Sequence, residues 1–570
     1  MTFGIILGYV ALLLCLTVFS TRFLKRSSGD YFLASRGIGS FMLLMSIFGT
    51  TMTAFALVGS TGRAFGKGIG VYGLMASWSA LVHSACFFLI GARVWALGKK
   101  HGYVTQLAFF RDRYRSDALV LLMFPLMVGF VVIYILMGVV GSGRVIEALT
   151  PETFAMRDRT TQVVVAEPPA KLTIPDAWQR RLRYDAATGT LTLTGSLHPK
   201  RRGELFRMYG APPTPAWKKV IGELIAKAPR GAVPYAFGMG FVCLVVLIYV
   251  FFGGMRATAW ANTFQTLVFM AMGIVAFVVI TDKLGGPAEA TRRLLASAAA
   301  ERAVRGEQMG QGQFLTYCFI PLSVGMFPHL FQHWLTAKKA SSFKLTVVAH
   351  PLFIAITWVP CILLGIWAAA ELPAHTNPNA VLGIMVAKHS GEVLSGLIGA
   401  GILAAIMSSM DSQFLCLGSL FTNDIVVRYG SRLGLGEIGD RTKVLYGRLF
   451  VLAMVVVVFL IGLTSPGGVF PIGVWCFTGF ASLFPIVLAA VYWRRSNKHG
   501  VIAAVLTVGV LWFWFLGDAL SGEFLIAGMM PVTVILGASS FALVVVTLLT
   551  PAPPQDLQDK FFPTSRVSVR

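Results

Sequence analysis

Two adjacent serines inside an apolar segment carry the clearest chemical signal in this sequence. Ser408 and Ser409 lie within Ile402–Gln413, a stretch that otherwise has the composition of a membrane helix. On a helix, Ala405 lies one turn before both serines, so one short face offers two hydroxyl oxygens and, where the backbone is open, a carbonyl oxygen. A hard cation such as Na⁺ prefers oxygen ligands of this kind. The alternative interpretation is structural, because small serines also permit close helix packing or bond back to their own helix.

The segments that would position this motif are membrane spans. The 570-residue chain is 56% hydrophobic and 13% charged, and apolar runs of spanning length recur from end to end. We therefore predict one all-α polytopic membrane protein with about thirteen transmembrane helices. The apolar runs lie near residues 3–20, 39–60, 69–97, 117–147, 233–254, 262–282, 313–335, 344–370, 392–426, 443–464, 469–491, 499–516 and 523–550.

The net charge of +23 follows the expected membrane topology and does not indicate a nucleic-acid partner. With the N-terminus outside, the inner segments hold the basic patches near 22–36, 99–115 and 494–498. The short outer loops keep Arg63, Lys67 and Lys388. This asymmetry is the positive-inside rule. It predicts a multi-pass protein of the inner or plasma membrane, with the N-terminus outside and the C-terminus cytoplasmic.

The first apolar run is predicted to remain as a span. Its charges follow it rather than precede it, and it shows no small-residue cleavage site. The seven cysteines all fall inside apolar runs. They indicate small buried hydrophobic residues, so neither a disulfide framework nor a metal cluster is expected.

Two loops depart from the short connections between spans. The loop 283–312 is rich in Ala, Arg and Glu and is expected to hold a short amphipathic helix, whereas 148–232 is an extracytoplasmic insertion. Within the insertion, 183–194 alternates polar and apolar residues around a turn and predicts a hairpin. An amphipathic stretch follows at 217–228. The insertion is a lid, a partner-binding surface or a neutral addition, and the last is favoured because no catalytic constellation occurs in it.

The predicted organisation is a first span with its inner loop at 1–38, first-repeat helices at 39–147, the insertion at 148–232, the rest of the first repeat at 233–282, an outer loop at 283–312, a second inverted repeat at 313–491, peripheral helices at 492–550 and a cytoplasmic tail at 551–570.

Two spans contain helix-breaking residues at membrane depth. Gly49 stands among hydroxyl residues in the second span, and Gly325 and Pro328 interrupt the seventh. Lost backbone hydrogen bonds at this depth are tolerated only where protein, water or an ion supplies partners. Each broken span opens a block of five spans, 39–282 and 313–491, which is typical of inverted-repeat secondary transporters. The alternative is simple kinking in an ordinary helix bundle.

These motifs together resemble the sodium:solute symporter family, a group that includes proline, pantothenate, sugar, iodide and monocarboxylate carriers. The resemblance covers nearly the whole chain apart from 148–232. It depends above all on Gly401–Gln413, followed by Asn423-Asp424-Ile425. Supporting motifs are Tyr31–Arg36, Phe252–Ala257, and Pro328-His329 with Gln332 and Lys338. The fold that the resemblance implies is a LeuT-like core of two inverted five-helix repeats with broken helices, together with flanking helices.

The resemblance implies a sodium site between the broken second span and the span that carries the serines. Its ligands would be the backbone carbonyls of Gly49, Met52 and Ala405 and the hydroxyls of Ser408 and Ser409. Sodium that bridges the two repeats would shift the equilibrium between outward and inward arrangements. Na⁺ is therefore the expected coupling ion.

One position near this site departs from the family pattern. Several members carry an acidic residue where this chain has Asn262, and Thr51 stands where some have Asp or Asn. The site is therefore expected to be nearly neutral, which weakens sodium affinity and in the extreme uncouples sodium. Asp411 is the remaining carboxylate nearby, and it either faces the inner water-filled cavity or is hydrogen-bonded near the inner end of its helix. Three histidines either shuttle protons or, as we favour, make structural hydrogen bonds at the membrane interface: His329, His333 and His350.

The solute pocket is the least defined part of the prediction. The resemblance implies that the two broken spans line it with Thr51, Phe55, Ser323 and Gly325. Phe55 and its successor stand where sugar-type members use polar side chains, which disfavours a sugar. No arginine lies at the membrane centre, so a solute carboxylate would rest against backbone N–H groups of a broken helix.

The predicted function is sodium-coupled import of a small carboxylate or zwitterion by alternating access, with the solute, Na⁺ and the lipid bilayer as partners. The alternatives are a proton-coupled or sodium-independent carrier of the same fold, and a membrane sensor derived from a transporter. A tail of residues 551–570 is too short for a signalling output domain, which disfavours the sensor. No nucleophile–base pair or repeated pore motif stands out, so neither an enzyme nor a channel is expected.

Overall fold

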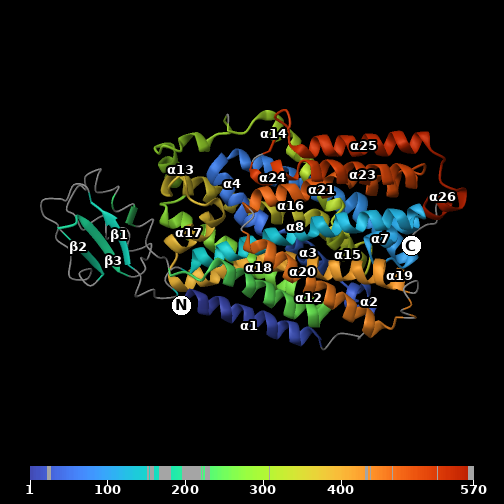
Figure 1. The fold of residues 1–570 in the computed structure, drawn as a ribbon, viewed down its shortest axis with the longest axis horizontal. Helices are drawn as coiled ribbons and strands as arrows, with labels where there is room; N and C mark the ends of the chain where they lie inside the picture. Colours follow the sequence, from blue (N-terminus) through green and yellow to red (C-terminus); the bar gives the residue numbers. More distant parts are fainter. Residues whose placement is uncertain are drawn as a thin grey trace.

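The protein is a long helical bundle with a small β-sheet at one end (Figure 1). The N-terminus lies at the end that carries the sheet, and α7 (Gln106–Tyr114), α19 (Val427–Tyr429) and α26 (Gln555–Phe561) lie at the other end. The computed structural model describes residues 1–21, 27–150, 160–165, 181–185, 187–194, 231–306, 308–430, 438–464, 467–522 and 524–562, with Thr153, Val220, Glu223, Leu224, Gly434 and Gly436.

The described helices fall into two series on either side of the loop after residue 283. The first series is α1 Thr2–Thr21, α2 Ser28–Leu33, α3 Ser40–Thr51, α4 Ser60–Lys67, α5 Trp78–Cys86, α6 Ala92–His101, α7 Gln106–Tyr114, α8 Asp117–Leu149 and α12 Tyr235–Lys283. The second is α13 Pro287–Leu295, α14 Gln311–Thr316, α15 Pro328–Thr336, α16 Ser342–Glu371, α17 Val381–His389, α18 Glu392–Leu420, α19 Val427–Tyr429, α20 Asp440–Leu463, α21 Val469–Ser482, α22 Phe484–Tyr492, α23 Lys498–Trp514, α24 Leu516–Ser521, α25 Pro531–Leu549 and α26 Gln555–Phe561. Short 3₁₀ or π segments join them: η1 Ala34–Arg36, η2 Phe55–Gly59, η3 Tyr72–Ser77, η4 Phe87–Gly91, η5 Ala300–Ala303, η6 Tyr317–Gly325, η7 Pro378–Ala380 and η8 Phe421–Val426.

Nine helical segments in the described chain are long and apolar enough to cross a bilayer, and two bent pairs bring the number to eleven. The 49 residues of α12 exceed a single span, because at 1.5 Å per residue they reach about 73 Å against a hydrocarbon core of ~30 Å. Gly254 breaks this segment with a φ of 57°, a conformation that glycine adopts without steric cost. Counting α12 as two spans and adding the shorter apolar helix α23 gives the expected thirteen. The exact count stays a prediction.

Both expected helix breaks are present. The halves α3 and η2–α4 are bent by 56°, and the halves α14–η6 and α15 are bent by 51°. In the second break Pro328 is the first residue of α15, and Phe327 before it is extended at φ −62° and ψ 117°. Proline disfavours the helical conformation in the preceding residue, so the chain leaves the helix here. Each broken span therefore has open backbone at membrane depth.

The core of the bundle lies around α18. In its most apolar window 83% of residues are buried, against 22% for α20, 28% for α25 and 33% for α1. A helix that is apolar all round is either buried in the core or faces lipid. α18, which carries the serine motif, is therefore the central helix, and α1, α20 and α25 lie at the lipid-facing periphery.

Two of the supporting motifs, Tyr31–Arg36 and Phe252–Ala257, pack against each other. The Tyr31 hydroxyl donates to the Val250 carbonyl at 3.1 Å, and a Cβ on Gly254 would lie 2.6 Å from the Tyr31 ring. Arg256 pairs with the fully buried Asp30 at 2.7 Å. A buried carboxylate needs such a partner, so these motifs hold the break in α12 against α2.

The described part of the insertion is a three-stranded antiparallel sheet in the order β1-β3-β2, from Thr160–Val164, Thr190–Thr194 and Leu182–Asp185. The expected hairpin is present, since Arg183 pairs with Thr192 and Tyr184 with Leu191. Asp185 accepts hydrogen bonds from Ala187 and Thr188 in the turn. The amphipathic stretch expected at 217–228 falls almost entirely outside the described residues. The short helix expected in 283–312 is α13. The domain boundaries proposed from the sequence stay predictions.

Candidate ion and solute sites

The break in the second span follows from its run of threonines. The Thr51 hydroxyl donates to the Phe48 carbonyl at 2.9 Å, inside the last turn of α3. Met52 is extended, at φ −88° and ψ 102°. The Thr53 hydroxyl then accepts the Phe55 N–H at 3.0 Å, as an N-terminal cap does. Local side-chain hydrogen bonds thus replace helical ones on both sides of the break.

The carbonyl of Gly49, next to this break, meets the first of the two adjacent serines of α18. Ser408 Oγ lies 2.8 Å from the Gly49 carbonyl oxygen and 3.0 Å from the Ala405 carbonyl oxygen. Gly49 and Ala405 are themselves fully buried. Three oxygens from two different helices therefore converge at one buried point between α3 and α18. We call Gly49, Ala405, Ser408 and Ser409 the ion layer.

The other two expected ligands, Met52 and Ser409, lie nearby in the sequence, but their described hydrogen bonds go to other residues. Ser409 Oγ bonds back to the Ile406 carbonyl at 2.9 Å, which is the structural role that small hydroxyls often take in membrane helices. Met52 is fully buried and donates its N–H to Phe48. The structure therefore brings together Gly49, Ala405 and Ser408.

Gly49 is required by packing rather than by backbone conformation. A Cβ at this position would overlap Thr266 Oγ1 and lie 3.4 Å from the Asn262 carbonyl oxygen. The Thr266 hydroxyl already donates to the Met45 carbonyl at 3.0 Å. The α3, α12 and α18 backbones can approach this closely because position 49 has no side chain.

A second layer of polar side chains lies one turn further along α18, at Ser412. Asn262 Nδ2 donates to Thr50 Oγ1 at 3.1 Å and to Ser412 Oγ at 3.0 Å. His333 Nε2 lies 3.0 Å from Ser412 Oγ. Tyr249 donates to Asp411 Oδ2 at 3.2 Å. We call Thr50, Tyr249, Asn262, His333, Asp411 and Ser412 the polar network.

Asp411 is part of this network and does not face a water-filled cavity. Its side chain is fully buried, and its Oδ1 accepts the Ser412 hydroxyl at 3.0 Å. Ser412 in turn joins Asp411 to Asn262. The carboxyl group of Asp411 on α18 therefore lies two hydrogen bonds from Asn262.

The three histidines singled out from the sequence are buried side chains. His329, His333 and His350 are all at most 1% exposed and lie within the bundle. Sequence reasoning did not place His333 beside the ion layer. Two signals were available, because Ser412 follows Ser408 by one helical turn and His333 follows the break at Pro328.

Three of the four residues expected to bind the solute line the same cavity. Thr51, Phe55 and Ser323 line a cavity of about 30 Å³, together with hydroxyls from Thr53, Ser79, Tyr134 and Tyr317. Gly325 is not part of its wall, because it packs against Phe484, whose ring atoms would lie 2.6 Å from a Cβ there. We call this space the solute cavity. In the present arrangement it has room for about one water molecule.

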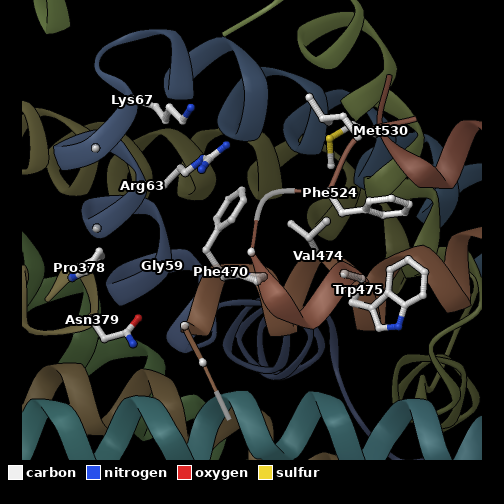
Figure 2. A pocket seen from close by; sticks show the side chains of 18 of the residues that line it. Gly59, Arg63, Lys67, Pro378, Asn379, Phe470, Val474, Trp475, Phe524 and Met530 are labelled. Atoms are coloured by element: carbon white, nitrogen blue, oxygen red, sulfur yellow. The ribbon is translucent and has the colours of Figure 1, made fainter. Parts of the chain in front are cut away.

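A much larger pocket of about 740 Å³ includes Phe470 in its lining, and we call it the vestibule. Figure 2 shows Arg63 and Lys67 on one wall, Phe470 projecting between them and Val474, and Phe524 with Met530 on the far wall. Phe55 stacks on Phe470 at 5.3 Å between ring centroids and meets Phe477 edge-on at 5.0 Å. These rings separate the solute cavity from the vestibule.

The fold and the site define a class of membrane transporter: two blocks of helices, each opened by a broken span, with buried oxygens and a closed cavity at the breaks. The profile of the sodium:solute symporter family matches residues 31–155 and 224–509. The chain belongs to this family and is a multi-pass membrane protein.

The relatives support the same class. The chain is 24% identical to the osmoregulated proline transporter OpuE of Bacillus subtilis over 342 residues, which are 59% of this chain and 66% of that one. It is 21% identical to the sodium/pantothenate symporter of Escherichia coli over 523 residues, 89% of each chain. A solved structure of a Na⁺-coupled sialic acid symporter, in a substrate-bound outward-open state, superposes with a TM-score of 0.67 at 14% identity, over 97% of this chain and 98% of that one. The fold is therefore LeuT-like.

Proposed function

We propose that the protein is a sodium-coupled symporter that imports a small carboxylate or zwitterion by alternating access. One observation carries the proposal: Ser408 on α18 meets the open carbonyl of Gly49 on the broken α3 at 2.8 Å. These two elements belong to different repeats. A cation held between them stabilises the arrangement in which they touch, so its binding energy shifts the conformational equilibrium.

The proposed sodium ligands are the carbonyls of Gly49, Met52 and Ala405 and the hydroxyls of Ser408 and Ser409. A small shift of Ser408 away from the carbonyls opens a space surrounded by oxygens from both helices. Ser409 joins the set when its hydroxyl turns away from Ile406. Na⁺ suits such neutral oxygen ligands. The carboxyl group of Asp411 lies nearby, in the polar network.

Two observations support a solute with a carboxylate. The relatives are named for proline, pantothenate and sialic acid, which all carry a carboxylate. The charged residues that line the vestibule are Arg63, Lys67 and Arg144, all of them basic. A cationic vestibule raises the local concentration of anions at its mouth. The solute would pass the Phe55 and Phe470 rings and bind between Thr51, Phe55 and Ser323, with Gly325 supporting the wall from behind.

The proposed orientation has the N-terminus outside and the C-terminus inside the cell. The vestibule then opens outward, because Arg144 stands at the end of α8 that leads into the insertion. At the opposite end a polar pocket of about 620 Å³ lies beside α7 and Asp424. The ion layer and the solute cavity lie between the two, as alternating access requires.

Uptake into proteoliposomes tests the proposal. A panel of labelled carboxylates and amino acids, including L-proline and pantothenate, is offered with and without an inward sodium gradient. We expect at least one solute to accumulate only with the gradient. Ser408→Ala and Ser409→Ala should raise the sodium concentration for half-maximal uptake, with the larger increase at Ser408. Ser395→Ala, at the far end of the same helix, is the matched control. An unchanged sodium dependence in both variants contradicts the ligand assignment.

A proton-coupled or sodium-independent carrier is the second candidate, and Asn262 is the observation that favours it. Its amide fills the place of the family carboxylate and donates to Thr50 and Ser412. Accumulation that follows an imposed proton gradient and ignores sodium would select this alternative. The same proteoliposomes serve both tests.

A further inference from the structure

A pair of buried histidines borders the solute cavity. His83 of α5 lines the cavity beside Ser79, which stands one turn earlier on the same helix. Its Nδ1 lies 3.2 Å from Nε2 of His350 on α16. His83 is 7% exposed and His350 is fully buried. Two imidazoles at this distance share one proton, with one ring as donor and the other as acceptor.

The cavity wall contains one imidazole side chain. Its fourteen residues include hydroxyls, aromatic rings and aliphatic groups, and His83 is the basic residue among them. No Asp, Glu, Lys or Arg belongs to this wall in the part of the chain that the structure describes. Burying a carboxylate there without a strong donor would be costly. The wall therefore offers a bound carboxylate the His83 imidazole, beside its hydroxyl groups and the indole N–H of Trp358.

His83 has a second ring nitrogen, Nε2, besides the one that contacts His350. Within the described residues, the hydrogen bond of the His83 ring is made through Nδ1. If His350 Nε2–H donates this bond, neutral His83 carries its own proton on Nε2. Nε2–H is then a donor available to a ligand in the cavity that His83 lines.

His350 is held in place by its aromatic neighbours. Its ring meets Phe48 edge-on at 5.3 Å and Phe87 edge-on at 4.9 Å between centroids. Phe48 directly precedes Gly49 in the last turns of α3. The orientation of the His83 donor is thus set by a ring packed against the broken helix.

We propose that His83 binds the carboxylate of the transported solute through Nε2, and that His350 is the positioning residue that keeps this nitrogen a donor. The inference rests on the proposed function, because it assigns the solute class to one side chain of the solute cavity. It makes His83 the specificity-determining residue for carboxylates over neutral analogues.

Paired probes that differ only at the carboxylate test this role. Pantothenate and its alcohol analogue pantothenol, and L-proline and L-prolinamide, compete for uptake of whichever carboxylate the wild-type protein accumulates in proteoliposomes. We expect His83→Leu to weaken the apparent affinity for the carboxylate by about 10- to 100-fold, which is the range for a hydrogen bond to a charged group. The apparent affinity for the analogue that lacks the carboxylate should stay within about two-fold of the wild-type value. His83→Gln keeps an N–H donor and should retain most of the preference. Ser84→Ala, on the same helix but bonded to the Val347 carbonyl, is the matched control.

His350→Phe should reduce the carboxylate preference less than His83→Leu does, and His350→Gln should restore it by keeping a donor toward His83. Equal losses for the carboxylate and its analogue would overturn the assignment and show a structural role. So would a full preference in His83→Leu. If the wild-type protein accumulates no member of the panel with either gradient, the proposed function itself fails, which is a separate outcome.

Discussion

The ion layer and the solute cavity use the same break in the second span in different ways. In the ion layer, the Ser408 hydroxyl lies at about 3 Å from each of two backbone carbonyls, and packing there depends on a residue with no side chain. The solute cavity is closed by aromatic rings and has room for about one water molecule. The first region is built mostly from backbone atoms and the second from side chains, so a substitution in the second is expected to alter the solute more than the proposed ion.

This contrast predicts the most severe effect at the ion layer. Gly49→Ala should abolish sodium-driven uptake, because its Cβ overlaps Thr266 Oγ1 and separates α3 from α12 and α18. Gly273→Ala in α12, where a Cβ meets nothing within 4 Å, should be close to wild type. Uptake in proteoliposomes with matched protein amounts measures both. Partial recovery in Gly49→Ala with Thr266→Ala would confirm the steric cause, and wild-type uptake in Gly49→Ala alone would refute it.

The polar network should set sodium affinity with a smaller effect. Asp411→Asn removes the buried carboxyl group that lies two hydrogen bonds from Asn262, and we expect sodium affinity to fall by about ten-fold, since disturbing a buried hydrogen bond costs ~1–3 kcal/mol. Adding Asn262→Asp to this variant returns a carboxyl group to the neighbouring position and should recover most of the affinity. Sodium titration of uptake measures it. Equal affinity in all three proteins would show that the network is only structural.

Phe55 separates the two spaces on the solute side. Phe55→Ala removes the ring that stacks on Phe470 and meets Phe477, which should join the solute cavity to the vestibule. We expect solute affinity to fall by about ten-fold with a much smaller change in sodium affinity, because large buried aromatic rings contribute a few kcal/mol of contact. Competition binding and sodium titration on the same preparation separate the two. A parallel loss of both affinities would show that the ion layer and solute cavity are not independent.

The vestibule should give the smallest effect. Lys67→Gln lowers the positive charge at the mouth and should raise the solute concentration for half-maximal uptake by about two- to three-fold at low salt. The difference should shrink as ionic strength rises, because surface charges are screened within ~10 Å at 0.1 M salt. A Lys67→Arg control should match the wild type. A salt-independent defect would point to a packing role for this side chain instead.

The sequence by itself determined the class of protein and the location of its breaks. Apolar runs indicated the spans, and Gly49 among hydroxyl residues and Pro328 predicted that two of them open, because these effects act within one turn of backbone. In the second span the opening lies at Met52, and Gly49 itself stays inside α3. The serine motif likewise predicted Ser408 and Ala405, since residues three apart share a helix face. Resemblance to a family added Gly49, which no local rule would have paired with Ser408 across 359 positions of sequence.

The tertiary structure alone decided which polar groups meet across helices. Asp411 is connected to Asn262 through Ser412, and Ser412 and Asn262 are 150 residues apart in the chain. His83 contacts His350, which is 267 residues away. The sequence predicted structural hydrogen bonds for His350 without identifying their partner. Packing buries His350 beside His83, and each ring supplies a hydrogen-bond partner that the other would lose in the bilayer. Such pairing depends on helix–helix register, which no single segment encodes.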